Sequence, residues 1–264
     1  MFLVDTHCHL ADERFAGDRR EVIAAARAAG IGMLAVGVDL ASSRFNLELA
    51  ASHSGVLAAV GIHPTNAGGL NGDDWRRLRE LAASPLASAI GETGLDHHWK
   101  NVPAGVQKLW FERHIELALA VKKPLLVHAR DSIGEVLAML EPCLASGLAV
   151  VWHCFSAGRG EIRAALDFSV AHGIRMAAGG LVTFEDRKSL RACLPGIPDE
   201  LLLLETDAPY LPPRPRISSR NEPARLPRIA EAVAELRQRS PADIARLTTG
   251  NAEKLFPGFV EGRS

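Results

Sequence analysis

The chain begins with the stretch Phe2-Leu3-Val4-Asp5-Thr6-His7-Cys8-His9, whose first residues form an apolar run typical of a buried β-strand. His7 and His9 are two residues apart, so on an extended strand their side chains point to the same side, while Cys8 points to the other. Two neutral imidazoles at the end of a strand provide half of a metal site. The motif alone leaves open a pair of strand-end histidines that merely contact solvent.

The same succession of a short apolar run, a polar or glycine-containing junction and an amphipathic helical segment recurs along the chain. Short, continuously apolar runs are expected for parallel strands that are buried on both faces. Eight runs in 264 residues predict an α/β fold, a (β/α)8 TIM barrel, with one domain over residues 1–264. A doubly wound open sheet is the structural alternative, but no G-x-G-x-x-G follows the first run. The strands are expected at 2–6, 33–38, 56–62, 86–90, 124–127, 148–152, 174–178 and 201–204.

Helical segments are expected between these runs and after the last one. A loop rich in Pro and Arg, over 208–223, separates the last strand from two closing helices. The expected helices are 21–29, 43–52, 73–83, 105–121, 133–144, 160–172, 224–239 and 241–255, the last with a break near residue 250.

The composition is that of an ordinary soluble globular protein, with 47% hydrophobic and 23% charged residues. No run of about 18 apolar residues occurs, so no membrane-spanning helix is expected. No basic segment precedes the first strand, which argues against a signal peptide. Four cysteines without a C-x-x-C spacing indicate free thiols and a cytoplasmic location. The net charge of −1 means that any nucleic-acid contact must use a local basic patch.

Polar residues recur at the C-terminal ends of the apolar runs. In a barrel these ends meet on one face, where active sites form. One strand-end histidine is more often simply hydrogen-bonded than a ligand, but seven residues of metal-ligand type at six of eight ends predict a metal site. The seven are His7, His9, His63, Glu92, His128, His153 and Asp207.

Four imidazoles and two carboxylates of this set are too many ligands for one tetrahedral zinc ion. They suit two ions about 3.5–4 Å apart, bridged by one carboxylate. Mixed nitrogen and oxygen ligands favour Zn, Mn or Fe-type ions, and Mg can also bind carboxylates and water. Such a pair generates hydroxide near neutral pH and polarises a phosphoryl or carbonyl oxygen, so the expected reaction is hydrolysis. The predicted metal ligands are His7, His9, Glu92, His128, His153 and Asp207.

Eight short motifs resemble the signatures of the TatD-type metal-dependent hydrolases, which belong to the amidohydrolase superfamily of TIM barrels. The resemblance runs from residue 3 to about residue 256. D-T-H-x-H alone would suggest only the superfamily, whereas the combination is specific. The motifs are Asp5-Thr6-His7-Cys8-His9-Leu10, Gly61-Ile62-His63-Pro64, Gly91-Glu92-Thr93-Gly94-Leu95-Asp96, Val127-His128-Ala129-Arg130, His153-Cys154-Phe155, Glu205-Thr206-Asp207-Ala208-Pro209-Tyr210-Leu211, Arg220-Asn221-Glu222-Pro223 and Asn251-Ala252.

The resemblance implies a divalent-metal-dependent deoxyribonuclease with 3′-to-5′ exonuclease activity and DNA as substrate. By this likeness, one ion is held by His7, His9 and Asp207, and the other by His128 and His153, with Glu92 as the bridge. Asp207 is also implied as the base that takes a proton from the attacking water. The superfamily's commoner bridge is a carboxylated lysine; here Glu92 holds that place, so carboxylation is not expected.

Several further residues have both a functional and a structural interpretation. His63 could bind a substrate phosphate, steady the leaving group or only fix its loop. Asp96 could orient a ligand histidine or be an ordinary turn residue. A basic cluster near the last strand could bind phosphate or face water, with Arg220 as the first candidate for substrate binding. The cluster comprises Arg214, Arg216, Arg220, Arg225 and Arg228, and the aromatic residues that could contact a base or pack are Trp99, Phe155 and Tyr210.

Two other functions are compatible with the same ligands. One is a binuclear hydrolase of amide, ester or lactone bonds in a small substrate, because a metal pair drives those reactions too. An uncharged small substrate has no need of the arginines, which favours the phosphodiesterase. The other is a catalytically silent metal-binding scaffold, which would be free to lose part of the ligand set. The natural substrate, the metal and the oligomeric state stay open, and a monomer is one possibility.

Overall fold

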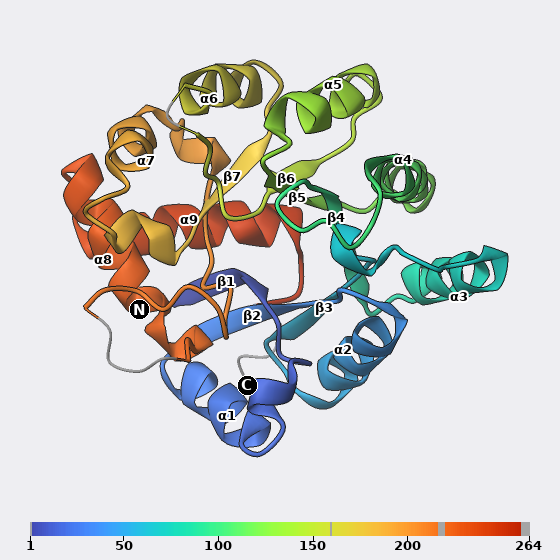
Figure 1. The fold of residues 1–264 in the computed structure, drawn as a ribbon. Helices are drawn as coiled ribbons and strands as arrows, with labels where there is room; N and C mark the ends of the chain where they lie inside the picture. The colour runs from blue at the N-terminus through green and yellow to red at the C-terminus, as the bar shows by residue number, and fades with distance from the viewer. Residues whose placement is uncertain (1, 159, 216–219, 260–264) are drawn as a thin grey trace.

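The computed structural model describes residues 2–158, 160–215 and 220–259, which form eight parallel strands ringed by helices (Figure 1). The strands pair in chain order, each parallel to the next. This order confirms the predicted (β/α)8 barrel, because a doubly wound sheet reverses its order midway. The strands are β1 (Leu3–Cys8), β2 (Ile31–Val36), β3 (Val56–Val60), β4 (Ala87–Asp96), β5 (Leu125–Arg130), β6 (Val150–Trp152), β7 (Arg175–Ala178) and β8 (Leu202–Leu204).

The first and last strands meet at a seam where side chains supplement the backbone ladder. One isolated parallel bridge pairs Cys8 with Ala208. The buried carboxylate of Asp5 accepts hydrogen bonds from the backbone N–H of Thr206 at 2.8 Å and from its hydroxyl at 2.5 Å. These bonds connect β1 to the segment after β8. They thereby bring Asp207 close to His7 and His9, which lie about 200 residues earlier in the chain.

Helices follow the strands and cover the outside of the barrel. The helix after β2 begins earlier than predicted, because Asp39 caps it in a capping box with Ser42. The last helix runs unbroken through Gly250, and a short helix between β7 and β8 was not predicted. The helices are α1 (Arg19–Ala28), α2 (Leu40–Ser52), α3 (Gly72–Ala83), α4 (Ala104–Val121), α5 (Ile133–Leu144), α6 (Ile162–Ala171), α7 (Lys188–Cys193), α8 (Leu226–Arg237) and α9 (Pro241–Leu255). Within the described residues, no helix has the length and apolar sequence required to span a bilayer.

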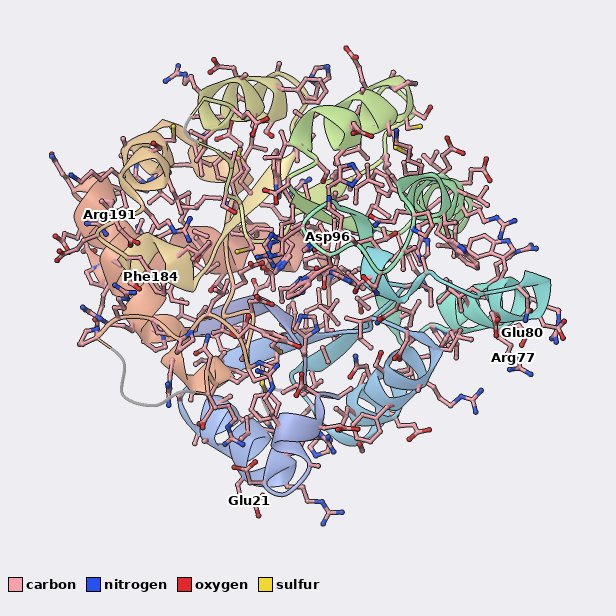
Figure 2. The ribbon with its side chains drawn as sticks, in the orientation of Figure 1. Glu21, Arg77, Glu80, Asp96, Phe184 and Arg191 are labelled. Carbon is pink, nitrogen blue, oxygen red and sulfur yellow. The ribbon has the colours of Figure 1, made fainter. Side chains whose placement is uncertain are left out.

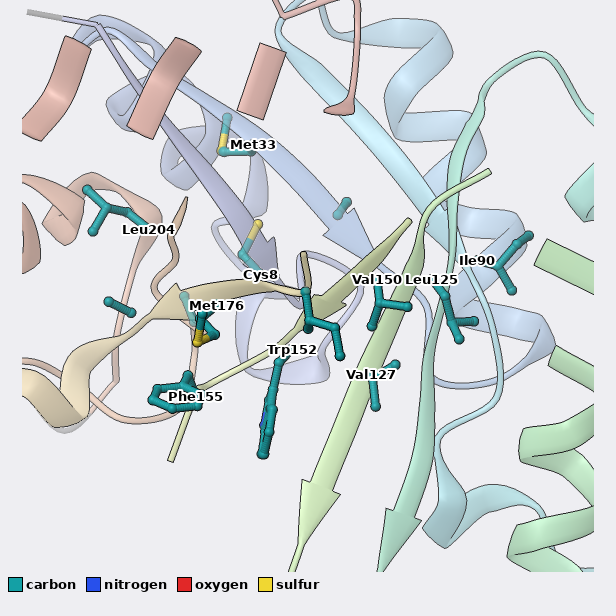
Figure 3. Close-up of a cluster of buried hydrophobic side chains, with 14 of the residues drawn as sticks. Cys8, Met33, Ile90, Leu125, Val127, Val150, Trp152, Phe155, Met176 and Leu204 are labelled. Carbon is teal, nitrogen blue, oxygen red and sulfur yellow. The ribbon is translucent and has the colours of Figure 1, made fainter. Parts of the chain in front are cut away.

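Alternate residues of the strands contribute to two hydrophobic clusters. Figure 3 shows part of the larger one, with Met33, Leu125 and Trp152, and the same cluster includes residues of the surrounding helices. The smaller one contains their neighbours, such as Leu34 and Leu126, and fills the inside of the barrel. Because both faces of the strands are buried in this way, each run is apolar throughout.

Helix α9 closes one end of the barrel and so determines which end stays open. It lies behind the strands in Figure 1, and the residues after it, Phe256 and Phe259, belong to the inner cluster. Asn251 on α9 donates to the carbonyl of Leu202 at 2.9 Å, and Thr249 donates to that of Phe2 at 3.1 Å. Both acceptors lie at strand beginnings, so the C-terminal ends of the strands are left to form the site.

Candidate metal centre

A cavity of about 1020 Å³ opens at the C-terminal ends of the strands. Figure 2 shows Asp96 near the centre of this face, whereas Glu21 and Glu80 lie at the periphery of the molecule. In a barrel the C-terminal ends of all strands meet on one face, and the predicted metal site depended on this property. Among the predicted site residues, the cavity is lined by His9, His63, Glu92, His128, His153 and Asp207, and His7 lies buried directly behind them.

The end of β1 supplies two imidazoles that point to the same place. The Nε2 atoms of His7 and His9 lie 3.3 Å apart. Cys8 between them belongs to the larger hydrophobic cluster, outside the barrel, as the alternation of side chains along a strand predicts. The Nε2 atom of His9 lies 3.1 Å from Oδ1 of Asp207. The backbone of Asp207 has a φ of 57°, in the left-handed region that Asp tolerates better than most residues. Its N–H donates to the carbonyl of His7 at 2.9 Å, which fixes the carboxylate beside the two rings.

The carboxylate of Glu92 lies between two groups of histidines. Its Oε2 atom is 3.3 Å from Nε2 of His7 and 3.7 Å from Nε2 of His9. Its Oε1 atom is 2.9 Å from Nδ1 of His128 and 3.6 Å from Nε2 of His153. Burial raises the pKa of Glu92, but the surrounding imidazoles outweigh burial and hold it well below its usual value. Glu92 is therefore ionised and presents one oxygen to each group, which is the arrangement a bridging ligand requires.

Two further carboxylates hold the far sides of these rings. Nε2 of His128 lies 3.0 Å from Oδ2 of Asp96, and Nδ1 of His153 lies 2.9 Å from Oε1 of Glu205. The same Glu205 oxygen accepts the backbone N–H of Cys154 at 2.7 Å. Carboxylates in this position fix the orientation of metal-binding histidines. Sequence reasoning assigned Glu205 no role, although its place two residues before Asp207 was a usable signal.

The charges of the site oppose the effect of burial. Burial lowers the pKa of His153, but the negative charges of Glu205, Glu92 and Asp207 outweigh it and raise the value to about 10. Burial raises the pKa of Asp207, yet His153 and His9 bring it below its usual value. Burial and the charge of His153 lower the pKa of His7 to about 4. The site is thus a concentration of negative charge with a few neutral or protonated rings, and a divalent cation would match it.

His63, like His7, is a neutral ring, and its contacts show which ring nitrogen carries the hydrogen. Its Nδ1 atom accepts the backbone N–H of Thr65 at 3.2 Å, so the ring hydrogen lies on Nε2. That Nε2 atom is on the cavity side, 3.7 Å from Oε1 of Glu92. Burial lowers the pKa of His63 to about 3, which keeps the ring neutral. His63 can therefore donate a hydrogen bond into the cavity.

This geometry can be set beside the known proteins that the chain resembles. The sequence model of a family described as TatD related DNase matches residues 4–257. The chain belongs to this family. It is 35% identical to the uncharacterized metal-dependent hydrolase YabD of Bacillus subtilis, over 96% of this chain and 98% of YabD. It is 40% identical to the 3'-5' ssDNA/RNA exonuclease TatD of Pantoea ananatis, over 96% and 99% of the two chains. The crystal structure of the TatD homologue YjjV from Escherichia coli superposes with a TM-score of 0.88 and 25% identity, covering 96% of this chain and 97% of YjjV.

The chain is thus a metal-dependent hydrolase of the TatD family, as the motifs predict. Its cluster of histidines and carboxylates supplies the candidate metal-binding groups. One such group comprises His7, His9 and Asp207, and a second comprises His63, Glu92 and His128. A third contains His7, His153 and Glu205, and Oε1 of Glu205 lies 2.9 Å from Nδ1 of His153.

The arginines of this TatD-family hydrolase lie differently from the expectation. Arg220 does not line the cavity; its guanidinium donates to Asp18 at 2.8 and 2.6 Å and to Glu222 at 3.0 Å. Its substrate-binding role stays a prediction that this pairing does not favour. Of the other predicted arginines, Arg216 lies outside the described residues, and Arg214, Arg225 and Arg228 do not line the cavity. Of the arginines that the structure describes, those that do line it are Arg14, Arg19 and Arg130.

Proposed function

We propose that this TatD-family hydrolase is a nuclease that uses two divalent metal ions to remove nucleotides from the 3′ end of DNA. The observation that carries the proposal is the position of Glu92, which presents one oxygen to His7 and His9 and the other to His128 and His153. The Pantoea ananatis relative is named for 3'-5' exonuclease activity on single-stranded DNA and RNA, which supports the polarity and the class of substrate.

The donor atoms fit a pair of ions. His7, His9 and Asp207 would hold one ion, His128 and His153 would hold the other, and Glu92 would bridge them. The fit is supported by the far nitrogens of His128 and His153, which face carboxylates and leave the near nitrogens free to act as ligands. When bound, the ions would supply Lewis-acid activation of water and of a phosphoryl oxygen. Nitrogen and oxygen ligands together favour Zn or Mn, with Mg as a further candidate.

The residues around the reacting phosphate would divide the remaining work. Asp207 is ionised and lies beside His9, and it would take the proton of the attacking water. His63 carries its hydrogen on Nε2, so it would donate to a phosphate oxygen and support the substrate-binding role predicted for it. Because its pKa is lowered to about 3, this donor would stay neutral over the physiological pH range.

The test is hydrolysis of 5′- and 3′-labelled single- and double-stranded DNA by metal-stripped protein, with Mg, Mn or Zn added back. We expect metal-dependent release of nucleotides from the 3′ end. The Glu92→Ala and Asp207→Ala variants, alone and combined, should keep the wild-type circular dichroism spectrum and lose at least about 10²-fold in rate. Full activity in a folded double variant would contradict the proposal. Silence with every metal, in protein that binds two ions, would favour the hydrolase of amide, ester or lactone bonds instead.

We further propose a cytoplasmic location. All four cysteines are free thiols, namely Cys8, Cys143, Cys154 and Cys193. Free thiols persist in a reducing compartment. Labelling of the unfolded protein with a thiol reagent, directly after extraction, should modify four groups per chain.

A further inference from the structure

The mouth of the cavity carries the strongly exposed aromatic side chains of the described part of the chain. Trp99 is 56% exposed and Tyr210 is 45% exposed, and both line the cavity. An aromatic ring exposed at the mouth of a cavity offers a flat face on which a nucleobase can stack. The two rings lie on different sides of the candidate metal centre: the Tyr210 ring lies 5.6 Å from that of His9, whereas Trp99 follows β4 near His128.

Trp99 is fixed relative to the candidate metal centre through one carboxylate. Its backbone N–H donates to Oδ1 of Asp96 at 3.0 Å, and Oδ2 of the same carboxylate lies 3.0 Å from Nε2 of His128. The indole and the ligand histidine are therefore anchored to the same side chain. A flat ring in this place can meet a nucleobase attached next to a phosphate that lies over Glu92 and His128.

Arg130 provides a cation at the same wall of the cavity. It follows His128 by two residues on β5, so the strand directs both side chains toward the same side. Its guanidinium carbon lies 5.9 Å from the centre of the Trp99 ring. Within residues 2–158, 160–215 and 220–259, no hydrogen bond or ion pair of the Arg130 side chain is found.

The other two arginines of the cavity are already engaged. Arg14 pairs with both oxygens of Asp12, at 3.0 and 2.9 Å, and lies 4.0 Å above the ring of Tyr210. Arg19 donates to the carbonyl of Leu10 at 2.6 Å and to the two carbonyls that follow. Among the arginines that the described part of the chain brings to this cavity, Arg130 is consequently the one whose charge is available to a ligand.

We propose that Trp99 and Arg130 form a nucleotide-binding element, in which an unpaired base stacks on Trp99 while Arg130 binds a phosphate of the same strand. This inference rests on the proposed nuclease function and names the residues that select its substrate. Stacking on an aromatic ring accepts any base, but only a base that has left its duplex partner. The element therefore favours single-stranded ends, with little preference for sequence. Tyr210, with Arg14 above its ring, offers a second flat surface on the His9 side for a neighbouring base.

The first experiment varies the protein and the substrate independently, so that the effect of the Trp99 side chain can be compared in the presence and absence of a terminal base. Wild type and Trp99→Ala, each loaded with metal, hydrolyse a single-stranded oligonucleotide with either normal or abasic 3′-terminal residues. We expect Trp99→Ala to raise KM for the normal strand on the order of tenfold, with kcat and bound metal unchanged. The abasic strand should show the same KM with both proteins, and Trp99→Phe should restore most of the affinity for the normal strand. An equal effect on both strands, or no effect on either, would overturn the stacking role.

The second experiment separates the phosphate contact from general electrostatics. Arg130→Ala should raise KM for normal and abasic strands alike, and it should reduce the slope of log KM against log salt by about one. Arg246→Ala is the matched control, because Arg246 is an exposed arginine on α9, at the other end of the barrel. A salt slope in Arg130→Ala equal to that of the control would exclude the contact.

Binding of a cleavage-resistant phosphorothioate strand separates this inference from the proposed function. Fluorescence anisotropy with metal-loaded protein should give a weaker affinity for Trp99→Ala and Arg130→Ala than for wild type. If wild type and both variants bind and hydrolyse normal strands equally well, the nucleotide-binding element is refuted and the nuclease function stands. Binding that depends on both residues, without turnover by wild type, would refute the nuclease function and leave the element standing.

Discussion

The Nε2 atom of His128 lies 3.0 Å from Oδ2 of Asp96, while Nδ1 of the same ring lies 2.9 Å from Oε1 of Glu92. Burial lowers the pKa of His128, but the bonds to the two carboxylates outweigh it and raise the value above normal. The ring thus presents Nδ1 to Glu92 and Nε2 to Asp96. Because Asp96 also accepts the N–H groups of His98 and Trp99, it connects the ligand geometry to the wall of the cavity.

Replacement of Asp96 by Ala should weaken metal binding without removing a proposed ligand. Without its carboxylate partner the His128 ring can rotate, and loss of such a partner reduces metal affinity roughly 10–100-fold. Competition with a chromogenic chelator measures the change. Asp167→Ala is a suitable control, since Asp167 is exposed on α6 and pairs only with Arg163 among the described residues. An Asp96→Ala protein with wild-type metal affinity would show that the carboxylate does not orient His128.

Glu205→Gln should lower the pKa of His153 in metal-free protein. Burial alone lowers this pKa, and Glu205 is the first of the charges that bring it to about 10. Removal of that charge lets burial act more strongly, so the ring should lose its proton at a lower pH. Titration of the His153 ring resonances by NMR measures the shift. A value that stays at about 10 would mean that Glu92 and Asp207 alone hold the proton.

Metal affinity should rise with pH from about 7 to about 10. The pKa of His153 is raised to about 10, so at neutral pH its ring holds a proton that a metal ion must displace, and the pKa of His128 is raised in the same direction by its bonds to Asp96 and Glu92. Each displaced proton makes the affinity increase up to about tenfold per pH unit. Metal titrations at several pH values test this dependence. An affinity independent of pH over this range would show that the metal ligands are already deprotonated at pH 7.

The stability of metal-free protein should change in the opposite direction. The folded pKa of His153, about 10, exceeds its ordinary value of 6.5, so protonation stabilises the folded state. This contribution is complete below pH 6.5 and is lost as the pH rises through about 10. Metal-free protein should therefore show a falling Tm over that window, and metal-loaded protein should show a smaller decrease. Thermal melts of both forms at several pH values measure this difference. An equal change of Tm with pH in the two forms would contradict the assignment of this effect to His153.

Gly94→Ala should destabilise the protein and displace His128, a predicted ligand on the neighbouring strand β5. Gly94 has a φ of 140°, and a Cβ atom there would lie 2.0 Å from the carbonyl oxygen of His128. The strain and the clash together should cost about 3 kcal/mol in the free energy of unfolding. Gly134→Ala, on α5 with open space at its Cβ position, should instead gain about 0.5–1 kcal/mol. Urea denaturation of both variants measures the difference, and equal midpoints would refute the steric argument.

The sequence by itself determined the barrel and the residues that gather at its mouth. Short runs apolar on both faces require a covered parallel sheet, and their C-terminal ends carry His7, His9, Glu92, His128, His153 and Asp207. These inferences depend on local periodicity, which the chain carries in the spacing of neighbouring residues. The same reasoning ended the fourth strand at residue 90, whereas β4 continues to Asp96, because its glycines allow close approach to β5.

Only the tertiary structure decided how the residues of the site are paired. Arg220 stood in the expected phosphate-binding loop, but Asp18, far away in sequence, engages its guanidinium. Arg130 received no role, yet its charge faces the cavity without a described partner beside Trp99. Closure of the barrel brings such distant side chains within hydrogen-bonding distance, and local spacing contains no record of which of them will meet. The sequence therefore specified the candidate ligands of the site, and the closed barrel specified which charges remain available to a substrate.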